Sequence, residues 1–154
     1  MKKHVKLFED WKLNEYGLRQ EMNMKVSLSL EPDISEDIFS SSLANGVGYL
    51  QGYGLELTWD DNEYKRAKDR VKGENGKAII EDILMEILKD GGTLTFIDRE
   101  GDGEYTSTIT IKDVWEKVKT APYRNIINII DGNDDVDDAD AILQTVFFGE
   151  VIFG

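Results

Sequence analysis

An acidic cluster that runs directly into an apolar segment, at residues 134–154, limits the fold more than any other feature of the sequence. Residues 141–154 are rich in Ile, Leu, Val and Phe, and no Lys or Arg follows Arg124. Burying one such apolar side chain stabilises a fold by roughly 1.5 to 3 kcal/mol, so we expect this segment to be docked on the core. The aspartates before it, whose simplest role is to place negative charge at a helix N-terminus, are Asp134, Asp135, Asp137, Asp138 and Asp140.

Length and composition set broad limits on the protein. A chain of 154 residues fits one domain. Its 31 acidic and 18 basic residues give a formal charge of −13, which disfavours direct binding to nucleic acid or to an anionic membrane and suits a cationic partner, or none, better. The absence of Cys excludes disulfides, Cys-ligated zinc and thiol nucleophiles. With no apolar run of about 18 to 20 residues and no secretory signal, the sequence predicts a cytoplasmic protein without a membrane span.

The order of the predicted elements favours the α+β class. Alternating patterns predict strands at 24–30, 53–59, 93–98 and 104–111, the last two joined as a β-hairpin. Periodicity and caps predict helices at 35–44, 60–72, 76–90, 110–118, 123–130 and from the aspartates to 148, with a closing strand at 150–153. Without a regular βαβ alternation, we expect a single domain, residues 22–154, with several short helices on a small, mainly antiparallel sheet. Residues 1–21 are expected to form an N-terminal arm of loosely helical spacing, either docked or mobile.

Three of the predicted helices share a local pattern. Each has an Asp in its first turn and a Gly nine residues later, at Asp37 and Gly46, Asp82 and Gly91, and Asp140 and Gly149. The favoured interpretation is that each Gly stops its helix. The alternative is an internal duplication of a helix, its glycine stop and a following strand, although the unequal spacings argue against a regular array.

Positive charge is concentrated at residues 65–72, on a predicted helix where acidic residues are interleaved with it. The favoured explanation is a solvated helix face. The alternative is a site for a phosphorylated small molecule such as a nucleotide, because Arg66 and Arg70 could bind phosphate beside an aromatic surface. Trp59 and Tyr64 would supply that surface. These four residues are the candidate ligand-binding residues.

The acidic cluster is the second candidate site. Asp135, Asp138 and Asp140, with Gln144 one turn later, are predicted to contact a protein partner. The aspartates could also bind a hard cation loosely. We predict no metal site, however, because the cluster lacks the central glycine and the twelfth-position acid of a calcium loop.

Motifs for catalysis are absent from the sequence. His4 is its only histidine, and no P-loop, GxSxG or HExxH motif is present. Residues 98–103 begin like a calcium loop, but Ile109 holds the twelfth position, so a solvated hairpin turn is expected. We therefore predict no catalytic residue and no cofactor. A carboxylate-pair hydrolase in which Glu81 converges with the aspartates is the enzymatic alternative.

The C-terminal segment resembles a known family ending. It contains Ala139-Asp140, an apolar pair, Gln144, and then Phe148-Gly149-Glu150 followed by two aliphatic residues, an aromatic residue and Gly. This order resembles the ending of a family of small bacteriophage and prophage proteins. The resemblance implies a viral origin and no particular activity.

Two further stretches extend the resemblance over roughly residues 34–154. Residues 36–38 and 45–49 are similar to the Asp-Ile and Gly-Gly-Ile-x-Tyr-Trp segments of that family. Asn45 stands in place of the first Gly, and Leu50 stands in place of the Trp.

These observations lead to three hypotheses for function. The first is a non-enzymatic phage accessory protein that acts in the host cytoplasm by binding a host protein or a small ligand, for example to counter a host defence, and it is compatible with a homo-oligomer. The second is a minor virion or assembly component, because Leu7-Phe8-Glu9 and Leu13-Asn14-Glu15 look like the Leu-x-Glu sites trimmed by some prohead proteases. The third is a metal-dependent carboxylate hydrolase.

Overall fold

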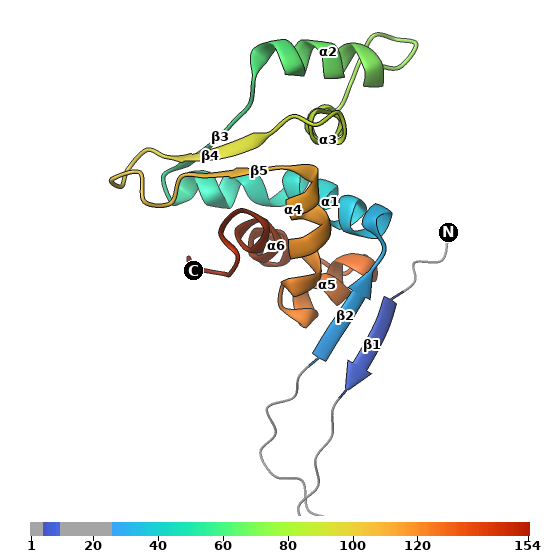
Figure 1. The fold of residues 1–154 in the computed structure, drawn as a ribbon, viewed down its shortest axis with the longest axis vertical. Helices are drawn as coiled ribbons and strands as arrows, with labels where there is room; N and C mark the ends of the chain where they lie inside the picture. Colours follow the sequence, from blue (N-terminus) through green and yellow to red (C-terminus); the bar gives the residue numbers. More distant parts are fainter. Residues whose placement is uncertain (1–4, 10–25) are drawn as a thin grey trace, which may run out of the picture.

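The computed structural model describes residues 5–9 and 26–154, whose arrangement is shown in Figure 1. The strands are β1 (Val5–Glu9), β2 (Val26–Leu30), β3 (Leu55–Thr58), β4 (Leu94–Asp98) and β5 (Ser107–Ile109). The helices are α1 (Pro32–Gly52), α2 (Asp61–Val71), α3 (Ile80–Lys89), α4 (Ile111–Lys117), the 3-10 turn η1 (Val118–Thr120), α5 (Tyr123–Ile130) and α6 (Val136–Phe148). Short helices thus pack on a small antiparallel sheet, β3-β4-β5, which is the predicted α+β fold.

Strands β1 and β2 form a separate antiparallel pair. In Figure 1 this pair and α2 lie at opposite ends of the molecule. The loosely helical arm predicted at residues 1–21 is therefore wrong for Val5–Glu9, which is a strand. The rest of that arm, with Trp11, lies outside the described residues. Among the described residues, none of the helices combines the length and the apolar composition needed to cross a membrane.

The core is centred on the contact between α1 and α6. Residues 142–147 of α6 are each at most 2% exposed, which confirms that the apolar segment is docked up to Phe147. Phe147 meets Phe96 of β4 edge-on, with ring centroids 4.3 Å apart, and lies 6.3 Å from Phe39 of α1. The same helix therefore joins α1 to the inner face of the sheet.

Helix α1 corrects the predicted helix at 35–44. It begins three residues earlier, at Pro32, because the fixed φ of proline suits the first helical position. It then continues through Asn45 and Gly46 to Gly52. Gly46 is buried, and a Cβ atom on it would lie 2.9 Å from the backbone carbon of Ala139 in α6. This glycine permits a close helix contact and does not end a helix.

The threefold helix-and-glycine pattern therefore holds for two of its members. Gly91 and Gly149 follow α3 and α6 with φ of +89° and +86°, as expected of glycines that end helices. Gly46 lies inside α1, and no strand follows Gly149. The alternative of an internal duplication at these three positions is wrong, because of the three glycines Gly91 alone both ends a helix and is followed by a strand.

The predicted β-hairpin is confirmed. Strands β4 and β5 pair antiparallel, with Leu94 opposite Ile109. In the turn between them, the Asp98 carboxylate accepts hydrogen bonds from the backbone N–H groups of Gly101 and Tyr105. This is the expected hairpin turn in place of a calcium loop. The closing strand predicted at 150–153 is wrong, because these residues adopt no regular structure and are held by a side chain of α6.

Candidate functional site

The four candidate ligand-binding residues do not form one pocket. Trp59 and Tyr64 stack on each other with ring centroids 5.4 Å apart. Arg70 pairs with Glu86 at 2.8 Å and with Asp90 at 3.3 Å, so its guanidinium group is already bound to carboxylates. Arg66 is exposed on α2.

Trp59 lines a small apolar pocket of about 170 Å³ between α1, β3 and α3. None of the other three candidate ligand-binding residues lines it. The residues around it are Leu43, Val47, Gln51, Leu57, Trp59, Ile80, Glu81 and Leu84. This lining contains no basic side chain, so the pocket offers nothing that would neutralise a phosphate group.

The first part of the acidic cluster caps α6. The Asp135 carboxylate accepts the N–H of Asp138, and the Asp138 carboxylate accepts the N–H of Asp135, so the two form a reciprocal capping box. Asp138 is 4% exposed and also accepts hydrogen bonds from the side-chain amides of Asn125 and Asn128 in α5. Its carboxylate therefore joins α5 to the start of α6.

The second part of the cluster holds the C-terminal residues. Gln144 is fully buried and donates to the carboxylate of Asp140 at 2.9 Å. Its side-chain oxygen accepts the N–H groups of Ile152 and Phe153. Of the four residues predicted to contact a partner, Asp138, Asp140 and Gln144 are thus buried and bonded inside the protein, and Asp135 alone is exposed.

The pKa values of the two buried aspartates, Asp138 and Asp140, are shifted in opposite directions. Burial raises the pKa of Asp138, but hydrogen bonds from Asp135, Asn125 and Asn128 outweigh it and hold the pKa below its ordinary value of 3.8. Burial raises the pKa of Asp140 above that value, with a smaller contribution from the charge of Asp137, while the Gln144 hydrogen bond opposes the shift. The folded state thus favours the ionised form of Asp138 and the protonated form of Asp140.

We expect Asp138→Asn and Asp140→Asn to respond to pH with opposite signs. The stabilisation from Asp138 is present above about pH 4 and is lost as the pH falls through its lowered folded pKa. The deficit in unfolding free energy of Asp138→Asn, relative to the native protein, should therefore become smaller in acid. The stabilisation from Asp140 is present at low pH and is lost as the pH rises through its raised pKa. Over that range, the free energy of unfolding of Asp140→Asn should therefore rise relative to that of the native protein. Urea unfolding at a series of pH values measures both, and deficits that change with the same sign would contradict the assignment.

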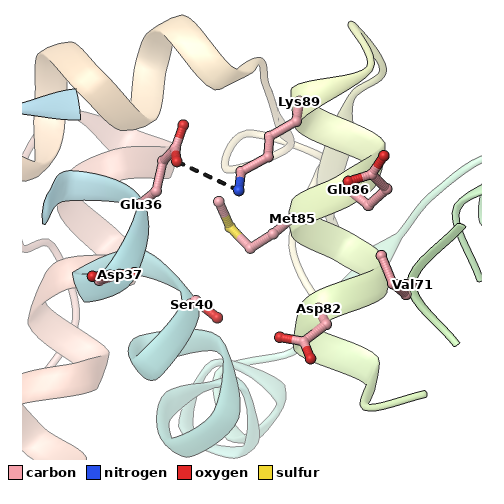
Figure 2. Close-up of a pocket in the computed structure, with 8 residues that line it drawn as sticks. All are labelled: Glu36, Asp37, Ser40, Val71, Asp82, Met85, Glu86 and Lys89. Carbon is pink, nitrogen blue, oxygen red and sulfur yellow. Dashed lines mark ion pairs between the residues drawn. The ribbon is translucent and has the colours of Figure 1, made fainter. Parts of the chain in front are cut away.

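A larger pocket of about 270 Å³ opens between α1, α3 and the end of α2. Figure 2 shows its lining, which consists of Glu36, Asp37, Ser40, Val71, Asp82, Met85, Glu86 and Lys89. We call it the acidic pocket, because four carboxylates and one ammonium group line it. Its residues in α1, 36–40, come before the residues of α1 that line the apolar pocket, 43–51.

Hydrogen bonds and ion pairs fix part of this lining. Glu36 accepts a hydrogen bond from the Trp115 ring at 3.1 Å and pairs with Lys89 at 3.6 Å, which closes one end of the pocket in Figure 2. Glu86 is held by Arg70. Asp82 lies toward the other end, across from Ser40, and has no hydrogen-bond or ion-pair partner within the described part of the chain. The pocket therefore keeps negative charge that its own lysine does not neutralise.

Sequence reasoning missed the acidic pocket. The sequence pattern interprets Asp37 and Asp82 only as acids near the starts of helices, and it gives no role to Lys89. The available signal was weak, because polar residues at 82, 86 and 89 are typical of the solvated face of an amphipathic helix. Only the crossing of α3 over α1 turns this face into a pocket wall. Within residues 5–9 and 26–154, no group of His, Cys, Asp or Glu side chains is placed to hold a metal ion.

Comparisons with protein-family models, with curated proteins and with solved structures found no match. The resemblance to bacteriophage proteins therefore stays a prediction.

Proposed function

We propose that this is a non-enzymatic phage accessory protein that acts in the cytoplasm of the host by binding a host protein. We further propose that the acidic pocket receives a lysine or arginine side chain of that partner. The observation that carries the proposal is the excess of carboxylates over ammonium groups in a pocket that is large enough for such a side chain. Interference with a host defence is the biological role that we attach to this binding.

The lining of the pocket supports a cationic side chain over a phosphorylated ligand. A phosphate group would meet the carboxylate of Asp82, which no cation of the described chain pairs with, and like charges repel strongly where water is partly excluded. A lysine or arginine could instead place its charged end near Asp82 and its aliphatic stem against Met85 and Val71. The net charge of −13 supports the same partner, because it would steer a basic surface toward the protein.

Removing charge from the pocket is expected to weaken partner binding strongly. Glu36→Gln with Asp82→Asn changes no side-chain volume appreciably and leaves an acceptor for the Trp115 ring. The matched control is Asp102→Asn with Glu104→Gln, which removes the same charge from two exposed residues of the β4–β5 turn. Losing a charge-assisted contact that is partly shielded from water typically weakens binding by about 2 kcal/mol or more, which is roughly thirtyfold.

The measurement has two parts. Affinity capture from host lysate should retain at least one protein with the native chain and with the control, and lose it with the pocket variant. NMR titration with argininamide should shift the resonances of residues 36–40 and 82–89 in the first two proteins only. A captured partner that binds the pocket variant equally well would sink the proposal, as would capture of no host protein.

A further inference from the structure

The residues after Gly149 fold back on α6 without regular secondary structure. Among the described residues, the side chain of Gln144 makes their hydrogen bonds. The Gln144 oxygen accepts the N–H groups of Ile152 at 2.8 Å and Phe153 at 2.7 Å, and its nitrogen donates to the carbonyl of Phe153 at 3.2 Å. These bonds hold the backbone of two successive residues against α6.

Asp140 sets the direction in which the Gln144 amide points. An amide group has an accepting oxygen and a donating nitrogen, so a neighbouring group that accepts from the nitrogen fixes which way the amide points. Because Asp140 takes a hydrogen bond from the Gln144 nitrogen, the Gln144 oxygen faces the backbone N–H groups of the C-terminal residues. Asp140 is therefore a positioning residue for this contact.

An aromatic surface lies beneath the same segment. The Phe153 ring stacks on Tyr53 with centroids 4.8 Å apart and an interplanar angle of 13°. Its centroid lies 5.1 Å from Tyr105 and 6.2 Å from Phe148, both edge-on. These three rings come from the end of α1, the β4–β5 turn and the end of α6, so none of them belongs to the segment that covers them.

The anchoring of this segment differs from that of α6. Residues 142–147 are at most 2% exposed, whereas Val151 is 45% exposed and Glu150 and Gly154 are also exposed. Gly149, in the left-handed conformation, separates the two parts. Segments with few buried apolar contacts open locally, at a lower free energy than the whole domain.

We propose that residues 150–154 form a detachable strap, and that the surface beneath it is a binding site for a short peptide with an aromatic side chain. Gln144 recognises two successive backbone N–H groups of the peptide. Tyr53, Tyr105 and Phe148 receive its aromatic ring. The strap occupies this site in the closed state, which makes it a built-in competitor for such a peptide. The inference does not depend on the acidic pocket.

Hydrogen exchange on the full chain tests whether the strap detaches. The amides of Ile152 and Phe153 should exchange at least a hundredfold faster than those of Ile142 and Leu143 in α6. Gln144→Met, which keeps the side-chain length but cannot accept from both N–H groups, should speed exchange at the strap a further tenfold or more and leave α6 unchanged. Equal protection of the strap and α6 would show a single cooperative unit and overturn the proposal.

Binding of a free peptide tests the site. A chain that ends at Gly149 should remain folded and bind the peptide Glu-Val-Ile-Phe-Gly saturably, with NMR shifts at Tyr53, Tyr105 and Gln144. The native chain should bind it at least tenfold more weakly, because its own strap competes. Replacing Phe in the peptide by Ala should remove binding. A folded chain of this length that does not bind the peptide, or one that is unfolded, contradicts the proposal.

Discussion

A chain that ends at Val146 is expected to be unfolded at room temperature. It lacks Phe147, which is 2% exposed and packs between Phe39 and Phe96. Losing a buried Phe side chain typically costs about 3 to 5 kcal/mol, which is a large part of the 5 to 15 kcal/mol that stabilises a typical domain. The Phe147 carbonyl, which accepts a hydrogen bond from the Ser107 side chain, is also lost.

Circular dichroism and the dispersion of amide NMR signals measure this effect. The control is the chain that ends at Gly149, which keeps Phe147 and the glycine that ends α6. A chain ending at Val146 with the thermal unfolding curve of the full protein would refute the assignment of α6 to the core.

Gly46→Ala is expected to destabilise the protein, although alanine is the better helix former. The added Cβ would lie 2.9 Å from the Ala139 backbone and 3.0 Å from a methyl group of Leu143, so α1 and α6 would have to move apart. Such overpacking typically costs about 1 to 3 kcal/mol, and in a domain of this size each kcal/mol lowers Tm by roughly 2 to 4 °C. Thermal unfolding followed by circular dichroism measures the change.

Gly48→Ala is the matched control for this substitution. Gly48 lies in the same helix, and a Cβ atom on it would meet nothing within 4 Å. The preference of helices for Ala over Gly should therefore act alone and stabilise the protein by about 0.5 to 1 kcal/mol. If both substitutions changed Tm in the same direction, the close contact at Gly46 would not be the cause.

Local patterns in the sequence predicted the elements that local forces determine. The β-hairpin follows from two alternating runs around a glycine-containing turn, and the Thr110–Asp113 capping box at the start of α4 is present as expected. Gly46 could not be interpreted in this way. A glycine that ends a helix and a glycine that admits a neighbouring helix look the same in sequence, and the difference here depends on Ala139, far along the chain.

The candidate sites show the same limit. The sequence distinguished Asp138, Asp140 and Gln144 as unusual residues, but it did not indicate that their polar atoms face inward, toward α5 and toward the C-terminal residues. The acidic pocket was not predicted at all. Its walls come from two helices distant in sequence, and the acids on each are ordinary in a chain with 31 of them.

The pairing of α1 with α6 also affects the route of folding. The two helices are separated by most of the described chain, so their contact forms only after a long loop has closed. Until then the face of α1 that packs on α6 lacks this partner. Contacts between residues distant in sequence slow folding more than local contacts do. During synthesis, α1 therefore emerges well before its partner, and the nascent chain has to stay unaggregated until α6 is complete.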